Sequence, residues 1–188
     1  MSLPRLSLLA ALAATAAILA PGGASACGCG EFRGVVVAHG SSLYGVPWRI
    51  KAILPRDAGP GRAMFEFTIG DPEESEGGYF TDLPRPIPRG LALTALRGSG
   101  FDDFPEADLS GIAAGRVALV RVEMEDGQTV EVEPARAPER LGDRFHWLRA
   151  LRFYDAFFPD SQEPVRVTAL DSNGQEVERL DFRHGAFR

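Results

Sequence analysis

The sequence predicts an all-β protein, an antiparallel β-sandwich of immunoglobulin-like character, folded either as one domain or as two small β halves. Apolar residues recur with a period of two in short runs, and turn-forming residues separate these runs, which is typical of strands that bury one face. Two pairs of runs are joined by Asp126-Gly127 and by Asp171-Ser172-Asn173-Gly174, and both connections predict tight hairpins.

The strands are expected in the following order. The amino-terminal runs cover residues 35–37, 48–54, 64–69 and 91–96, and the two hairpins cover residues 116–123 with 129–133 and 165–170 with 176–182. Residues 145–158 are so rich in apolar side chains that neither the helical nor the strand period dominates. Because Pro159 ends this stretch and aromatic residues favour strands, a strand is expected over 151–158. Apart from this stretch, only the amino-terminal leader has a pattern that favours a helix.

The first 26 residues have the three parts of a secretory signal peptide. A positive charge at Arg5 precedes an apolar run over residues 8–20, and Ala24-Ser25-Ala26 supplies a small-residue cleavage site. The apolar run is about a dozen residues long, whereas a helix that spans a bilayer needs roughly 20. We therefore expect a secreted or extracytoplasmic protein rather than one with a permanent transmembrane anchor.

Cys27 would become the first residue after cleavage, and a cysteine in this place can accept a diacylglyceryl anchor. Residues 24–27 resemble a bacterial lipobox, but Ala24 stands where lipoboxes usually carry Leu, so simple secretion and lipid anchoring at Cys27 both fit. Cys29 is the other cysteine, and a bridge between the two would close a small, strained ring. The Cys-Gly-Cys start is also similar to that of netrin-type protease inhibitors, a family that pairs these cysteines with partners this chain lacks.

Breaks in composition predict the domain organisation. Residues 57–61 and 71–78 are turn-rich or acidic, residues 84–89 form a polyproline-like passage, and residues 98–111 contain the boundary between two halves. The expected organisation is a signal peptide over 1–26, a Cys-Gly-Cys segment over 27–34, an amino-terminal β half over 35–110 and a carboxy-terminal hairpin unit over 111–188.

The charge balance excludes one class of partner. Without Arg5 the chain keeps 19 basic residues against 26 acidic ones, a formal charge of −7, and Lys51 is its single lysine. Such a surface disfavours nucleic acid. Contact with a membrane is expected only through a lipid anchor at Cys27, and no cofactor is expected.

Several segments of the carboxy-terminal part carry a resemblance. Residues 117–123, the Asp126-Gly127 turn with Thr129-Val130, residues 153–159 and residues 165–171 with Gly174 resemble uncharacterised exported actinobacterial proteins of β-sandwich type. Residues 45–49 resemble an element found earlier in such chains, and the main match covers residues 116–182. Because these motifs are sequence patterns of strands and turns, the resemblance implies a fold and no activity.

Each candidate for chemistry has a structural alternative. The spacing of polar residues over 171–176 is similar to that of a calcium-binding loop, but the final Glu is misplaced. Asn173-Gly174 instead favours a hairpin turn. The acidic run Asp102, Asp103, Glu106 and Asp108 could hold a hard cation, although such runs are more often solvated loops. His39, His146 and His184 share no metal-ligand spacing, and the residues after His39, Gly40-Ser41-Ser42, lack the Gly-x-Ser-x-Gly elbow of α/β-hydrolases. Catalytic, cofactor and metal residues are therefore predicted as none.

The aromatic residues of the 145–158 stretch are expected to pack mostly in the core, because alternate positions of a strand face the same side. Trp147 and Tyr154 are the candidates for an exposed aromatic platform, the alternative in which part of the group faces solvent.

Taken together, these patterns predict an exported, non-catalytic binding or structural module at the cell surface, with an unknown protein or glycan as partner. Two other classes stay open: a secreted carbohydrate-active or hydrolytic enzyme, and a secreted protease inhibitor. No nucleophile, base and orienting acid occur in a recognisable spacing, which disfavours the enzyme.

Replacing Cys27 by Ser in the full-length protein separates the two modes of export. If Cys27 carries lipid, Cys27→Ser should release the protein from the membrane fraction or block its maturation, because the chains of a lipoprotein supply the anchor. If the protein is simply secreted, its location should not change, and the Ala at position 24 favours this result. Cell fractionation with mass analysis of the mature amino terminus measures both, and Cys29→Ser is the matched control.

Overall fold

The computed structural model describes residues 34–53, 62–70, 79–84, 93–98, 106–183 and 186–187. Within these residues the chain is mostly strand, and the prediction of an all-β, antiparallel, sandwich-like protein is confirmed. No helix among the described residues is long and apolar enough to cross a membrane. The signal peptide, Cys27 and Cys29 lie outside the described residues.

The described strands form three antiparallel sheets. The first sheet contains β1 (Gly34–Ser41), β2 (Pro47–Ile53), β3 (Arg62–Ile69) and β4 (Tyr79–Pro84) in that order. The middle sheet has the order β5 (Leu96–Gly98), β6 (Glu106–Ala114), β10 (Leu151–Pro159) and β9 (Ala135–Arg136). The third sheet has the order β13 (Ala186–Phe187), β12 (Glu176–Arg183), β11 (Pro164–Leu170), β7 (Leu119–Met124) and β8 (Thr129–Val132).

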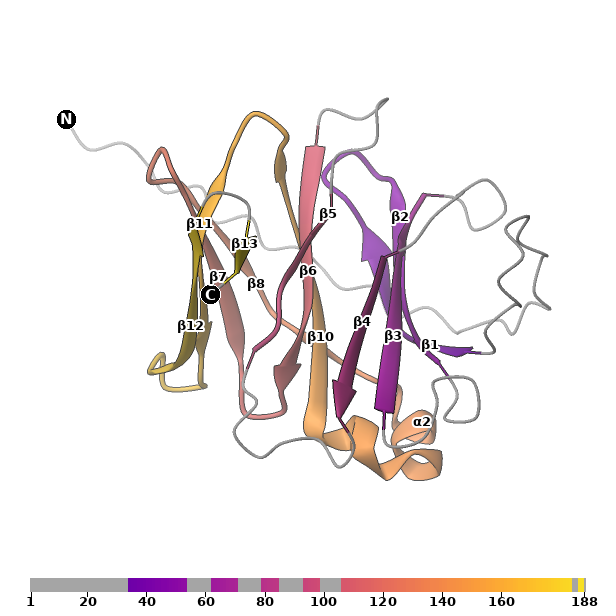
Figure 1. Cartoon of the computed structure of the whole chain (residues 1–188). Coiled ribbons are helices and arrows are strands. Elements are labelled where there is room, and N and C mark those ends of the chain that lie inside the picture. Colours follow the sequence, from indigo (N-terminus) through magenta and orange to yellow (C-terminus); the bar gives the residue numbers. More distant parts are fainter. Residues whose placement is uncertain are drawn as a thin grey trace.

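The three sheets are stacked as layers, with β6 and β10 between the other two (Figure 1). One apolar core lies between the first and middle sheets and contains, among others, Val37, Ile50, Phe65, Phe67, Ile112, Leu151 and Phe153. A second core lies between the middle and third sheets and contains, among others, Leu109, Ala113, Tyr154, Phe158, Val120, Val122, Val167 and Ala169. An immunoglobulin-like sandwich has two sheets, whereas the described strands of this protein form three.

The two central strands of the middle sheet, β6 and β10, are buried on both faces. β6 and β10 pair along their whole lengths, from Leu151 opposite Ala114 to Pro159 opposite Glu106. Every residue of β6 is buried, and so are most residues of β10. Because successive side chains of a strand point to opposite faces, Ile112 and Phe153 reach the first core while Leu109 and Tyr154 reach the second.

Most expected strands are present. The sequence correctly predicts the strands β1, β2, β3, β7, β8, β11 and β12, each to within a few residues, and both hairpins, β7 with β8 and β11 with β12, are confirmed. β10 also forms as expected, and the first part of the ambiguous stretch is a 3₁₀-helix, η1 (His146–Ala150). The short helix α2 (Glu139–Arg144) was not expected, and it places Glu139 in its first turn and Arg144 in its last, as the helix dipole favours.

β4, β9 and β13 were not expected either, and the longest strand missed by the sequence pattern is β6. Its acidic residues, Glu106 and Asp108, look like part of a solvated loop, and its other positions are mostly small. The boundary expected between residues 110 and 111 falls inside this strand. β6 joins the two expected halves because it pairs with β5 on one side and with β10 on the other.

Gly111 allows the close packing at the centre of the middle sheet. The Tyr154 hydroxyl donates a hydrogen bond to the Thr94 carbonyl at 2.6 Å, and this bond crosses directly over Gly111. A β-carbon at position 111 would overlap both the Thr94 carbonyl oxygen and the Tyr154 hydroxyl. The buried phenol therefore has its polar partner because residue 111 has no side chain.

Gly111→Ala should lower the free energy of unfolding by roughly 3 kcal/mol or prevent folding, because neither the backbone carbonyl nor the packed ring has room to move. Urea unfolding followed by circular dichroism measures the change. Gly115→Ala is the matched control, since its β-carbon would lie 3.3 Å from its nearest neighbour, the Ala150 carbonyl oxygen. Equal stability of the two variants would contradict this account of the packing.

Candidate functional site

Three hairpins of the structure are closed by the same turn. In each, a glycine amide donates to the carbonyl three residues earlier: Gly45 to Ser42 at 3.1 Å, Gly127 to Met124 at 3.0 Å and Gly174 to Asp171 at 3.0 Å. The three glycines have φ values of 82°, 82° and 75°, a conformation that favours glycine. A second backbone bond, of 2.8 to 2.9 Å, joins the first residue of each turn to the residue after the glycine. The backbones of the three turns are therefore equivalent.

The two central positions distinguish the β1–β2 turn from the others. Glu125-Asp126 and Ser172-Asn173 occupy these positions in the other turns, and polar residues of this kind are favoured there. In the β1–β2 turn the same positions hold Leu43 and Tyr44, whose exposed fractions are 65% and 61%. We call residues 42–45 the Leu-Tyr tip.

The Leu-Tyr tip is held in place from below. The Ser42 side-chain oxygen accepts the backbone amides of Tyr44 and Val46, each at 3.2 Å. Below the turn, Gly40 lies against the ring of Trp48, where a β-carbon would overlap the indole. The backbone of the tip is thus fixed before any partner binds, which lowers the entropic cost of binding.

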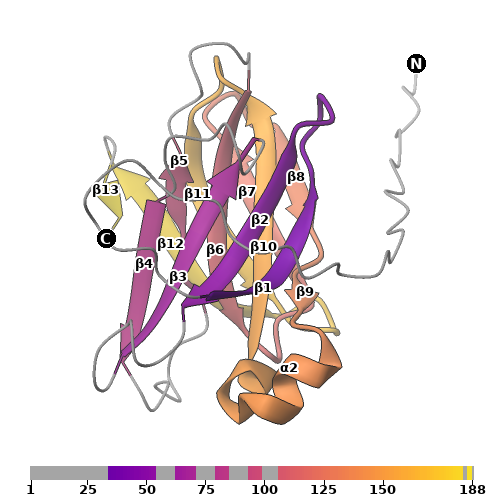
Figure 2. The ribbon, with the colours of Figure 1, turned by 90° about the vertical axis from the view of Figure 1, so that its right-hand side faces the viewer.

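Folding alone does not explain the two apolar side chains. Burying a side chain such as Leu contributes about 1.5–3 kcal/mol to the free energy of folding. Because Leu43 and Tyr44 stay mostly exposed, the fold gains little of this free energy from either residue. Among the other described residues, the large apolar side chains that are exposed are Val36 and Val165, each 37% exposed. No charged residue occurs from Gly40 to Trp48. The tip is therefore an exposed, apolar and uncharged turn at one end of the sandwich (Figure 2).

A second feature lies inside the protein. Glu106, Asp108 and Ser110 on β6 and Asp155 on β10 are all buried, and Asp155 lies opposite Ser110 in the register. They share the face of the middle sheet that carries Ile112 and Phe153, so they point toward the first sheet. The Ser110 hydroxyl donates to Asp108 Oδ2 at 3.0 Å. Within the described part of the chain, Glu106 Oε2 and Asp155 Oδ1 are buried without a hydrogen-bond partner.

The pKa of Asp155 is raised well above its ordinary value. Burial is the largest cause, because it removes water from the charged form, and the negative charge of Asp108 is the next. The nearby Ser110 hydroxyl acts in the opposite direction, while the charge of Glu106 and the proximity of the Asp108 carboxyl group raise the pKa further. Burial and the neighbouring acids therefore favour the protonated form of Asp155.

These positions correct the interpretation of the acidic run as a solvated loop. Glu106 and Asp108 lie in a buried strand, and the alternation of β6 turns both toward the first sheet. Asp102 and Asp103 lie outside the described residues. Asp155 was not a candidate from the sequence, because it interrupts a Phe-rich strand that reads as uniformly apolar. The signal that could have identified Asp155 is its position opposite Ser110, but this position is known only once the pairing of β6 with β10 is known.

The candidate metal and nucleophile residues are spread apart. Among the described residues no group of three or more His, Cys, Asp or Glu is arranged to hold a metal ion. His39 is an exposed residue of β1, His146 begins η1, and His184 lies outside the described residues. The residues after His39 belong to β1 and the tip, where the Ser42 oxygen accepts two amides.

The burial of Tyr154 contradicts the alternative in which Trp147 and Tyr154 form an exposed aromatic platform. Its side chain is fully buried, because its position on β10 faces the second core, and its hydroxyl is bonded to Thr94. Burial is the main cause of the raised pKa of this phenol, and the charge of Asp155 adds to it. Trp147 is half-buried and packs against the first core, with its ring 5.7 Å from that of Phe65. The two residues therefore belong to different cores and form no common surface.

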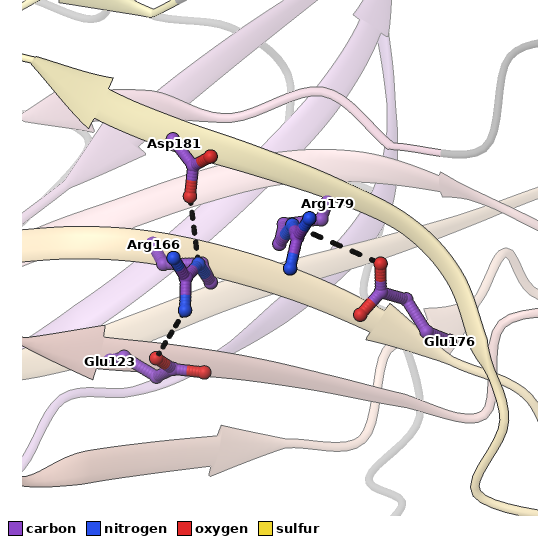
Figure 3. A network of polar contacts seen from close by, with 5 residues as sticks. All are labelled: Glu123, Arg166, Glu176, Arg179 and Asp181. Atoms are coloured by element: carbon purple, nitrogen blue, oxygen red, sulfur yellow. Dashed lines mark hydrogen bonds and ion pairs between the residues drawn. The ribbon is translucent and has the colours of Figure 1, made fainter.

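The outer face of the third sheet carries a row of ion pairs. Arg166 on β11 contacts Asp181 on β12 at 2.7 Å and Glu123 on β7 at 3.2 Å, and within β12 Arg179 lies 3.9 Å from Glu176 (Figure 3). Both carboxylates raise the pKa of Arg166, mainly through the hydrogen bond with Asp181. The charges of this row compensate one another, so we assign the row to the sheet rather than to a ligand.

Comparisons with protein-family models, with curated protein sequences and with solved structures find no match to this chain. The candidate site is therefore defined by its own geometry. Of the two features, the Leu-Tyr tip is open to a partner, and the buried carboxyl groups are enclosed between sheets.

Gly174→Ala should lower the free energy of unfolding by about 1–2 kcal/mol, because the positive φ at this position strains any residue with a β-carbon. Calcium should not alter the melting temperature of the wild-type protein, since the Asp171 carboxylate accepts the amides of Asn173 and Gln175 at 2.8 and 3.0 Å. Thermal unfolding with and without millimolar calcium tests this. A rise of several degrees would show that a cation binds the folded state and that the hairpin interpretation is incomplete.

Proposed function

We propose that this chain is an exported, non-catalytic binding module that contacts a protein partner at the cell surface through the Leu-Tyr tip. The observation that carries the proposal is the comparison of three equivalent turns, of which this one presents Leu43 and Tyr44 to solvent. The signal-peptide pattern of residues 1–26 supports the extracytoplasmic location. The proposed role needs no chemistry at the site.

The chemistry of the tip favours a protein over a glycan. Tyrosine is enriched among the residues that dominate protein interfaces, and it brings a large contact area at a low cost in conformational entropy. The adjacent Leu43 suits an apolar pocket and offers nothing to sugar hydroxyls. The side-chain oxygen of Ser42, the nearest polar atom of the turn, already accepts two backbone amides.

The energy available from the tip makes it an anchor within a larger interface. Burying the exposed parts of Leu43 and Tyr44 contributes roughly 3 kcal/mol, whereas a micromolar complex needs about 8 kcal/mol. The remaining affinity must come from surrounding surface, as in interfaces where a few central residues dominate. Removing the tip should therefore weaken binding on the order of 100-fold.

The experiment compares equivalent positions of two turns. A photo-crosslinking phenylalanine analogue replaces Tyr44 in one full-length variant and Asn173 in the other, because both residues occupy the third position of the same turn. Irradiation of cells of the source organism should give a protein adduct from position 44 and none from position 173. Adding Leu43→Ser to the first variant should remove most of the adduct, because the apolar anchor is lost.

The mass of the adduct identifies the class of partner. A defined, protease-sensitive adduct from position 44 supports the proposal. Adducts of equal yield from both turns, no adduct from position 44, or an adduct with the mass of a lipid or a glycan would overturn it. The two other classes considered from the sequence, a hydrolytic enzyme and a protease inhibitor, gain no specific observation from the described residues.

A further inference from the structure

Arg49 is the first charged residue after the Leu-Tyr tip, and it lies on the outer face of the first sheet. It alternates along β2 with Trp48 and Ile50, which pack into the first core, so its side chain points the other way. Figure 2 shows this outer face turned toward the viewer. A strand rises about 3.3 Å per residue, so Arg49 lies roughly 7 Å along β2 from the end of the strand that adjoins the tip.

Arg49 differs from the other cation of this strand in having no acidic partner. Lys51 lies opposite Glu66 in the register and forms an ion pair with it at 2.8 Å. Arg49 lies between His39 on β1 and Thr68 on β3, and in the described part of the chain no carboxylate forms an ion pair with it. Acids are not scarce in this chain, which has 26 of them against 20 basic residues. The fold therefore leaves the charge of Arg49 uncompensated.

The guanidinium of Arg49 is only partly enclosed. Its Nε is buried without a hydrogen-bond partner, whereas its two terminal nitrogens are not enclosed in this way. A buried N–H of a charged group that lacks an acceptor costs free energy, so the stability of the fold alone does not account for this arginine. The two open nitrogens lie in the plane of the guanidinium, and a carboxylate fits such a pair through two parallel hydrogen bonds.

We infer that the protein partner of the Leu-Tyr tip places the carboxylate of an Asp or Glu side chain on Arg49. The inference rests on the proposed function, and it identifies part of the surrounding surface that must supply the remaining affinity. Tyr and Arg are both enriched among the residues that dominate protein interfaces, and Tyr44 and Arg49 belong to one hairpin. A negative charge on the partner complements the uncompensated charge of Arg49. The matching surface has an apolar pocket for Leu43 with an acidic residue beside it.

Removal of one positive charge at Arg49 or at Lys51 tests the inference with matched variants. The photo-crosslinking analogue stays at position 44 of the full-length protein, and Arg49→Gln or Lys51→Gln is added. Arg49→Gln should reduce the adduct yield about tenfold or more, because it removes charge-assisted hydrogen bonds to the partner. Lys51→Gln removes the same charge from the same face, and it should change the yield less than about twofold because Glu66 already compensates Lys51.

A second measurement does not depend on the folding of an Arg49 variant. The analogue replaces His39, which lies opposite Arg49 in the register, and the partner segment of the adduct is sequenced. That segment should contain an Asp or Glu, and its replacement in the partner by Asn or Gln should reduce the adduct from position 44 as much as Arg49→Gln does. Combining this change with Arg49→Gln should cause no further loss, because both remove the same contact.

The outcomes separate the inference from the proposed function. If position 44 gives no protein adduct in the otherwise unchanged protein, the proposed function fails and the inference fails with it. If the adduct forms but Arg49→Gln leaves its yield unchanged, or if Lys51→Gln lowers the yield equally, the inference alone fails. A partner segment without an acidic residue, or losses that multiply when the two changes are combined, would also overturn the inference.

Discussion

Burial of both faces of one sheet is the constraint on which the other layers depend. β6 and β10 pair over their full lengths, and each supplies side chains to two separate cores. Neither face of these strands meets water, so the polar residues that alternate along β6, Glu106, Asp108 and Ser110, are buried together with its apolar ones. Its small residues have a similar origin, since the layers on either side must approach closely. Gly111 shows this most clearly, because the Tyr154 hydroxyl crosses it to reach Thr94.

The same constraint explains why the two candidate features differ in kind. Carboxyl groups placed on the middle sheet lose their water, and this burial raises the pKa of Asp155 well above that of an exposed Asp. The Leu-Tyr tip lies beyond the layers at the end of the first sheet, where nothing in the turn geometry calls for apolar residues. The packed layers fix the positions of β1 and β2, and the Leu-Tyr tip is the turn that joins these two strands. A polar cluster is thus enclosed in the core, while an apolar pair is held in solvent.

Local patterns predicted the parts of the fold that depend on local chemistry. Period-two runs located most of the strands, and the Asp-Gly and Asn-Gly sequences located the β7–β8 and β11–β12 hairpins. β6 was missed because its burial comes from strands distant in the sequence, and its Glu106 and Asp108 resemble loop residues taken alone. The Leu-Tyr tip was also missed, since its significance appears only when three turns prove to have the same backbone. Tyr154 was a candidate for exposure because alternation indicates that neighbouring residues face opposite sides but does not indicate that both sides are buried.

Hydrogen exchange of backbone amides tests the central role of the middle sheet most directly. Amides bonded between β6 and β10 are buried on both faces, so they should exchange only through global unfolding and be the slowest in the protein. Amides of β1 and β12, in the outer layers, should exchange faster through local opening. Rapid exchange across residues 106–114, at the rate of an exposed loop, would contradict a fold built around this pair of strands.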